Sequence, residues 1–186
     1  MKITIAKDAG YCFGVRDAVN MAYETAEKYG DVYMLGDIVH NEKVVADLEK
    51  AGAKVVQSLD QVPKESPVLF RAHGTKNDIW SEAKEKNLNV IDATCPLVIR
   101  VHNEAKKYHK EGRKVLLVGH KGHQEVIGTM GQLPEGSIKL IETVGEVKDL
   151  EFKKLELEVK SIFLIFKLRF NNCLTPLYSF SNFRFS

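Results

Sequence analysis

Two cysteines and four histidines in this chain follow short apolar segments, at points where a strand would end. Cys95 closes the segment that begins at Val90 and precedes Pro96, and proline suits the first position of a helix. Because ligands bind at the carboxyl ends of the strands in open α/β sheets, side chains at such positions face a crevice. The residues placed in this way are Cys12, Cys95, His40, His73, His120 and His123.

The two cysteines allow three interpretations. They could be small buried hydrophobic residues, ligands of zinc or of an iron–sulfur cluster, or a catalytic nucleophile. A helix amino end next to Cys95 would favour a thiolate there. The spacing of Cys12 and Cys95 is not C-x-x-C, and two thiolates are too few for an ordinary cluster. The cysteines alone therefore leave the choice open.

The histidines at strand ends point to metal or phosphate. A neutral imidazole can ligate a metal, and a protonated one can bind phosphate. Neighbouring glycines leave backbone N–H groups accessible to an anion at helix starts: Gly36, Gly74, Gly119 and Gly122. Neither a Walker-A sequence nor a G-x-G-x-x-G after a strand is present. Glu125 is either an ordinary glutamate in a first helical turn or a proton donor beside the ligand.

Strands and helices alternate through residue 150, which predicts an α/β fold with parallel sheets built from βαβ units. The apolar pattern places strands at 2–6, 32–35, 54–57, 67–70, 89–91, 114–118 and 138–141. It places helices at 15–26, 41–51, 76–86, 96 to about 112, 124–130 and 144–150.

Composition excludes several classes of partner. The 186 residues carry a formal net charge of +2, too small to indicate nucleic acid or a membrane surface. No apolar segment reaches the length of a membrane span, and the first residues lack the apolar core of a signal peptide. Three widely separated cysteines do not form a disulfide framework, so we expect a cytoplasmic protein.

The composition changes after residue 150. All 13 glycines and all six histidines lie before it, whereas residues 161–186 hold six of the nine phenylalanines and no acidic residue. This tail does not continue the alternating design, and its apolar segments have no clean period. We expect it to lie outside the pattern of the preceding residues.

Five motifs taken in order resemble the 4-hydroxy-3-methylbut-2-enyl diphosphate reductase family, which ends the non-mevalonate route to isoprenoids. The resemblance runs from residue 1 to about 150, and Gln124 stands where the family more often has proline. The motifs are Ala9 to Val15, Val39 to Asn41, Arg71 to Gly74, Asp92 to Pro96 and Gly119 to Thr129.

The resemblance implies three α/β domains around a central [4Fe–4S] cluster with three cysteine ligands. It implies reductive removal of the substrate's hydroxyl with two electrons from a ferredoxin- or flavodoxin-type donor. The products would be isopentenyl and dimethylallyl diphosphate. The implied site residues are the cluster ligands Cys12 and Cys95, the diphosphate-binding His40, His73 and His123, and the proton donor Glu125.

We expect a first domain over 1–95, a truncated second domain over 96–152, and a non-family tail over 153–186 for which disorder is one outcome. The third domain and its cysteine are missing from this pattern, and Cys173 lies in no family motif. An impaired or inactive reductase is therefore expected. The alternatives are a diphosphate-binding remnant without catalysis, and a zinc hydrolase with Glu125 as general base.

Overall fold

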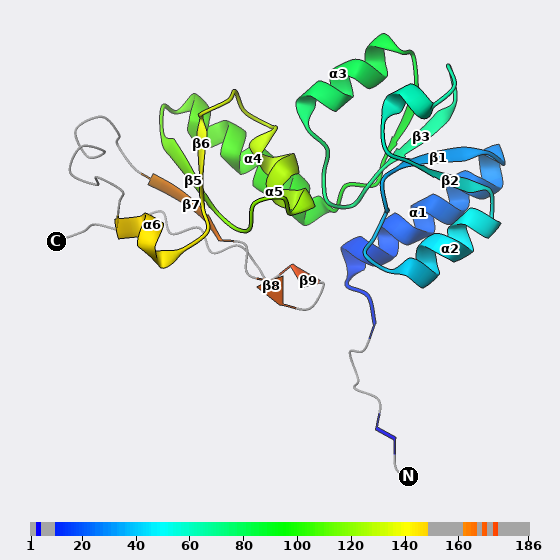
Figure 1. The fold of residues 1–186 in the computed structure, drawn as a ribbon, viewed down its shortest axis with the longest axis horizontal. Coiled ribbons are helices and arrows are strands. Elements are labelled where there is room, and N and C mark those ends of the chain that lie inside the picture. Colours follow the sequence, from blue (N-terminus) through cyan, green and yellow to red (C-terminus); the bar gives the residue numbers. More distant parts are fainter. Residues whose placement is uncertain (1–2, 5–9, 149–161, 167–168, 171–172, 175–186) are drawn as a thin grey trace.

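Two parallel sheets and a separate antiparallel pair, β8 with β9, make up the strands of the structure, a computed structural model that describes residues 3–4, 10–148, 162–166, 169–170 and 173–174 (Figure 1). The helices are α1 (Phe13–Tyr29), α2 (Glu42–Lys50), the 3-10 helix η1 (Leu59–Gln61), α3 (Asn77–Glu85), α4 (Pro96–Lys110), α5 (Gln124–Met130) and α6 (Val144–Lys148). The strands are β1 (Val32–Leu35), β2 (Ala53–Val56), β3 (Pro67–Phe70), β4 (Asn89–Asp92), β5 (Lys114–Val118), β6 (Ile138–Ile141), β7 (Ile162–Phe166), β8 (Arg169–Phe170) and β9 (Cys173–Leu174).

The strand order of both sheets confirms the predicted α/β class. The first sheet has the order β2-β1-β3-β4 and the second the order β6-β5-β7, and every pair in them is parallel. In each sheet one strand, β1 or β5, has later strands added on both of its sides. Ligands of open α/β sheets bind at such switch points, beyond the carboxyl ends of the strands.

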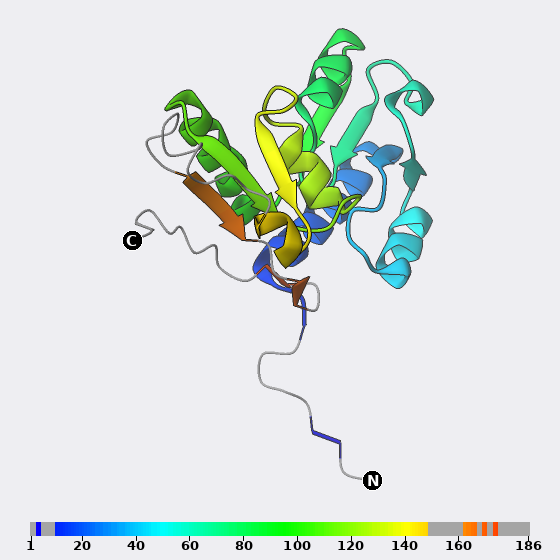
Figure 2. The ribbon, with the colours of Figure 1, turned by 60° about the vertical axis from the view of Figure 1, so that its left-hand side comes forward.

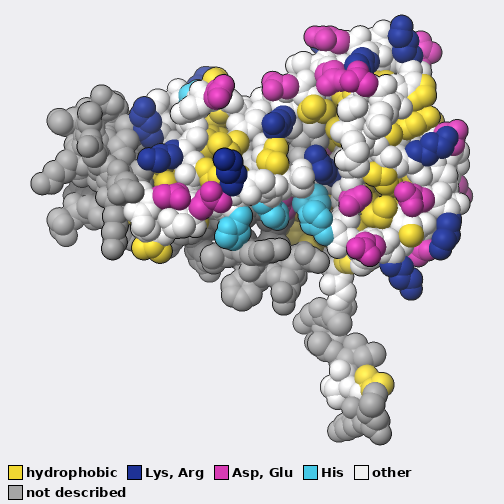
Figure 3. Space-filling model, in the orientation of Figure 1, with side chains coloured by type: hydrophobic (Ala, Val, Ile, Leu, Met, Phe, Trp, Pro, Cys, Tyr) yellow, Lys and Arg dark blue, Asp and Glu magenta, His cyan; other side chains and the backbone are white. Residues whose placement is uncertain are grey.

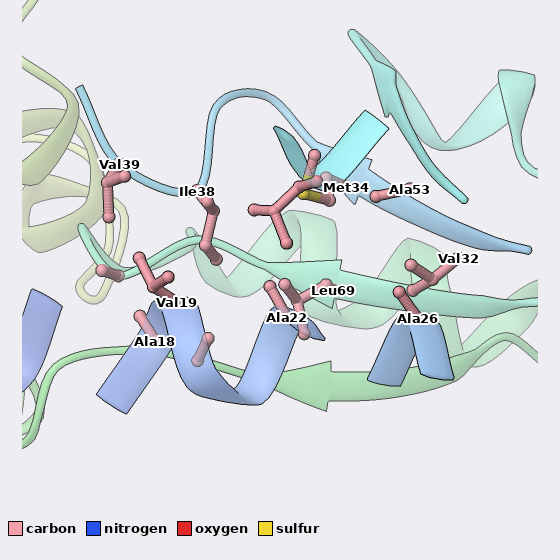
Figure 4. Close-up of a cluster of buried hydrophobic side chains, with 13 residues drawn as sticks. Ala18, Val19, Ala22, Ala26, Val32, Met34, Ile38, Val39, Ala53 and Leu69 are labelled. Carbon is pink, nitrogen blue, oxygen red and sulfur yellow. The ribbon is translucent and has the colours of Figure 1, made fainter. Parts of the chain in front are cut away.

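One face of the first sheet is covered by α1 and α2 (Figure 4). Alanines and valines recur on α1 at helical spacing, and their small side chains let the helix lie close to the sheet. Ala18, Ala22 and Ala26 pack against Met34 and Leu69, and all five are at most 2% exposed. Burial of a side chain as large as Met34 or Leu69 contributes about 1.5–3 kcal/mol to folding.

The opposite face of the first sheet is covered by α3 and η1. Phe70 and Val68 of β3 are fully buried there, and Ala83 brings α3 onto the sheet. The Phe70 ring meets the Trp80 ring edge-on, with centroids 4.8 Å apart. The central strand β3 is therefore enclosed on both faces, which fixes the position of the loop that follows it.

The second sheet packs against α4 and α5. Val101 and Ala105 of α4 and Val126 of α5 are buried against Val115 and Leu117 of β5. The first sheet and the second form two lobes with α4 and α5 at the junction (Figures 1 and 2).

The expected elements from residue 10 to 148 are confirmed within about three residues at each end. Four described elements were not expected: η1, β7, β8 and β9. Ile162–Phe166 is a continuous apolar segment without alternation, and that pattern is typical of a parallel strand; its backbone pairs with β5. The strand expected at 2–6 lies largely outside the described residues, as does most of 153–186. No helix in the described part of the chain is long and apolar enough to cross a membrane.

Close contacts at two glycines, Gly74 and Gly128, join the two lobes. Gly74, at φ +85°, lies so close to α4 that a Cβ atom there would be 2.6 Å from His102 Cε1 and 3.0 Å from Val98 Cγ1. Gly128 of α5 approaches the same turn, because a Cβ atom on Gly128 would lie 2.9 Å from the Gly74 carbonyl oxygen. The turn after His73 is therefore held between α4 and α5.

The substitution Gly128→Ala tests this contact, because it changes the free energy of unfolding through two effects of opposite sign. Alanine in a helix interior gains about 0.5–1 kcal/mol over glycine, whereas overpacking against backbone costs about 1–3 kcal/mol. We expect Gly128→Ala to lower the free energy of unfolding by about 1 kcal/mol or more in urea denaturation.

Gly145→Ala is the matched control. Gly145 is also helical, and its added Cβ would meet only the Thr143 hydroxyl at 3.7 Å. This variant should match or exceed the wild-type stability, by up to about 1 kcal/mol. Equal stability changes in the two variants would contradict the close approach at Gly128.

Candidate active site

Three histidine rings from three strand ends meet at the junction of the lobes. His40 follows β1, His73 follows β3, and His123 is the N-cap of α5 after β5. The His40 and His73 ring centroids are 4.4 Å apart, and those of His40 and His123 are 6.4 Å apart. Histidine side chains gather on the face shown in Figure 3, between the lobes. We call His40, His73 and His123 the histidine cluster.

The strand order explains why His40 and His73 meet. β1 and β3 are neighbours on either side of the switch point in the first sheet, so their loops diverge from adjacent strand ends. His123 joins them because the turn after His73 lies against α5. His120 is exposed, and its carbonyl accepts a hydrogen bond from the His123 N–H at 3.1 Å.

Cys95 lies beside the loop that carries His73. The backbone pairing of β3 and β4 continues past the strands, through Ala93 N–H to the Phe70 carbonyl and Cys95 N–H to the Ala72 carbonyl, both 3.0 Å. The Asp92 carboxylate accepts hydrogen bonds from the backbone N–H and the hydroxyl of Thr94. This Asx turn bends the chain into α4, with Cys95 as its N-cap and Pro96 in its first turn, as expected.

The other cysteine has the same relation to a helix. Cys12 is the N-cap of α1 and is half-buried, whereas Cys95 is 5% exposed. Gly14, in the first turn of α1, brings that turn against Cys95, since a Cβ atom on Gly14 would lie 2.3 Å from Cys95 Sγ. Two helix amino ends, each with a cysteine at its N-cap position, therefore meet beside the histidine cluster.

The turn of Cys12 is also tied to the loop of His40. The Asn41 side chain caps α2 by accepting a hydrogen bond from Val44 N–H at 3.1 Å. Its amide nitrogen donates to the Tyr11 hydroxyl at 2.7 Å. The cap is expected from the sequence, but the link to Tyr11 is not, because it joins residues 30 positions apart.

Arg71 is a cation near the site that the sequence analysis did not assign. Burial lowers the pKa of its guanidinium, and the negative charge of Asp37 partly opposes that shift. Its Nη1 atom occupies the space that a side chain on Gly36 would fill. Within the described residues nothing accepts a hydrogen bond from its buried Nε. Its place directly after a strand, two residues before His73, is the signal that could have identified it.

Glu125 lies in the first turn of α5, two residues after His123, and is half-buried. Thiolates suit iron or zinc, so Cys12 and Cys95 are the donors that such a site would use. The described part of the chain holds no group of three or more His, Cys, Asp or Glu residues arranged to bind a metal ion. The two thiols therefore fit part of a ligand set.

Comparison with known proteins places these features in a family. Residues 3–167 match the family model described as LytB protein. The matched range includes β7. A Beijerinckia indica protein called 4-hydroxy-3-methylbut-2-enyl diphosphate reductase is 48% identical over 155 residues, covering 82% of this chain and 49% of that protein. A Cereibacter sphaeroides protein of the same name is 44% identical over 157 residues, covering 84% and 49%.

Solved structures agree with the sequence comparison. The Plasmodium falciparum E-1-hydroxy-2-methyl-but-2-enyl-4-diphosphate reductase superimposes with a TM-score of 0.80 at 36% identity, covering 86% of this chain and 49% of that one. A second structure, of (E)-4-hydroxy-3-methyl-but-2-enyl diphosphate reductase, has a TM-score of 0.72 at 34% identity and covers 88% and 66%. The chain spans about half the length of the curated relatives it matches.

Removal of the Tyr11 hydroxyl tests whether the link to Asn41 steadies the Cys12 turn. A hydrogen bond is worth about 1 kcal/mol, which corresponds to about a fivefold change in local opening. We expect Tyr11→Phe to raise the alkylation rate of Cys12 about fivefold and to leave that of buried Cys95 unchanged. Peptide-resolved mass spectrometry measures both rates.

Tyr29→Phe is the matched control, because the Tyr29 hydroxyl also accepts a hydrogen bond from an asparagine amide, that of Asn89 at 3.3 Å. It should leave both alkylation rates unchanged. An unchanged Cys12 rate in Tyr11→Phe would show that the link does not hold the turn.

Proposed function

This chain belongs to the LytB protein family, and we propose from this premise that its histidine cluster binds the diphosphate of 4-hydroxy-3-methylbut-2-enyl diphosphate for reduction. The observation that carries the proposal is the meeting of His40, His73 and His123 beside Cys95. The relatives named above as diphosphate reductases support the choice of substrate.

The histidine cluster suits an anion with several charges. Imidazolium rings on three separate loops donate hydrogen bonds from different directions, and charge-assisted bonds of this kind are about twice as strong as neutral ones. Arg71 adds positive charge behind the loops of His40 and His73. A diphosphate held here would place the rest of a small substrate toward the two cysteines.

The reaction consumes two electrons and two protons. The allylic C–O bond breaks, the hydroxyl takes one proton and leaves as water, and the allylic carbon takes the other, which gives isopentenyl or dimethylallyl diphosphate. Glu125, in the first turn of the helix whose N-cap position His123 occupies, is the group we assign to proton delivery.

Cys12 and Cys95 are the residues that we assign as thiolate ligands of a [4Fe–4S] cluster. Thiolates are the usual protein ligands of iron–sulfur clusters, and the two cysteines stand at the N-cap positions of α1 and α4. Such a cluster, when bound, would pass the electrons to the substrate. We expect a ferredoxin- or flavodoxin-type protein to donate these electrons, in a reducing compartment such as the cytoplasm.

Anaerobic reconstitution of the full chain with iron and sulfide tests this function. We expect a [4Fe–4S] signal in Mössbauer spectra and, when a chemical reductant is present, conversion of 4-hydroxy-3-methylbut-2-enyl diphosphate to the two products at a rate below that of a full-length relative. Cys12→Ser and Cys95→Ser should each lose most of the signal, whereas Cys173→Ser should keep it.

Two other outcomes would overturn the proposal. A colourless chain that binds stoichiometric zinc and hydrolyses its substrate would indicate a metallohydrolase. A chain that binds diphosphate without cluster or turnover would indicate a binding protein.

A further inference from the structure

Gln132 is a buried polar side chain to which neither the motifs nor the proposed reaction gives a role. It follows α5 and is 6% exposed. Its Nε2 donates to the Thr75 carbonyl at 2.8 Å and to the Gly128 carbonyl at 3.0 Å. One amide therefore bridges the turn after His73, which belongs to the first lobe, and helix α5, which belongs to the second.

Asn77 reinforces the same bridge from the other side. Its backbone N–H donates to the Gly131 carbonyl at 3.1 Å, and its side-chain amide donates to the Gln132 carbonyl at 2.9 Å. Gly131 has no side chain to obstruct this approach, and a Cβ atom there would lie 2.4 Å from Lys76 Cγ. Four hydrogen bonds thus surround the place where the backbones of Gly74 and Gly128 approach each other.

The two partners of this bridge carry residues of the histidine cluster. The turn contacted at Thr75 begins two residues earlier with His73, and α5 begins at its N-cap His123. A buried amide donor left without an acceptor is costly, so Gln132 permits few alternative positions of the turn relative to α5. A shift there would move the His73 and His123 rings apart.

We propose that Gln132 is a positioning residue that sets the spacing of His73 and His123. Its effect on diphosphate affinity rests on the proposed function, but its effect on the ring positions does not. The structure therefore allows the two claims to be tested separately.

Gln132→Met is the main variant, because methionine keeps the length and volume of the side chain and removes both donors. The ring resonances of all histidines are followed by NMR in the ¹³C-histidine-labelled full chain, and the affinity for inorganic diphosphate is measured by calorimetry. We expect the His73 and His123 resonances to shift and the dissociation constant to rise about tenfold, the size of effect that loss of one or two buried hydrogen bonds produces.

Gln61→Met is the matched control. Gln61 also makes two hydrogen bonds with its side-chain amide, accepting from Gln57 N–H at 2.7 Å and Ser58 N–H at 3.4 Å, but it lies in η1 away from the histidine cluster. It should change neither the His73 and His123 resonances nor the diphosphate affinity. A loss of stability common to both variants would then not account for the shifts.

Asn77→Asp keeps the proposal testable where Gln132→Met does not fold. Asp is favourable at the first position of α3, and this change replaces the side-chain donor to the Gln132 carbonyl with an acceptor. It should shift the same two resonances by a smaller amount.

Wild-type resonance positions for His73 and His123 in both bridge variants would overturn the positioning role. If the His73 and His123 resonances shift in the variants but even the wild-type chain binds no diphosphate, the positioning role holds and the proposed function is refuted.

Discussion

The close approach of two glycine backbones, at Gly74 and Gly128, is the contact on which the site depends. It places the turn after His73 between α4 and α5, and these two helices begin at Cys95 and His123. A side chain at Gly128 would push this turn away from α5, and a side chain at Gly74 would push it away from α4. Backbone packing at this one place converts two sheet edges into a single site.

The strand order of each sheet determines which side chains it contributes to the site. Parallel strands bring their following loops to one edge, and ligands of open α/β sheets bind beside switch points such as those at β1 and β5. The first sheet supplies His40, His73 and Cys95 from three of its strand ends, and the second supplies His123 and Glu125 from one. Cys95 and His73 lie on adjacent loops because they follow the neighbouring strands β4 and β3.

The sequence predicted most elements because their signals are local. Apolar spacing marks α4, a continuous apolar segment marks β5, and Pro96 and Asn41 mark helix starts. β7 was not expected, because no turn residues bound its apolar segment and the composition of the chain changes after residue 150. The convergence of His40, His73 and His123 was expected only as a set of strand ends, and the structure brings the three together.

Other features of the site have no local signal. The Tyr11–Asn41 link, the guanidinium of Arg71 against Gly36, and the bridge of Gln132 all join residues that are far apart in the sequence. Their geometry depends on strand order and on how closely two backbones approach, and neither is encoded in a short window. The roles of the cysteines, the histidines and Glu125 stay predictions that the structure makes specific.

A diphosphate titration of the histidine rings is the most direct test of a single site built from both sheets. In ¹³C-histidine-labelled chain, inorganic diphosphate should shift the resonances of His40, His73 and His123 along one saturation curve, with His109 on α4 unaffected. One dissociation constant for all three rings is the result that the account predicts. Separate curves for rings of the two sheets, or no shift of these rings, would contradict it.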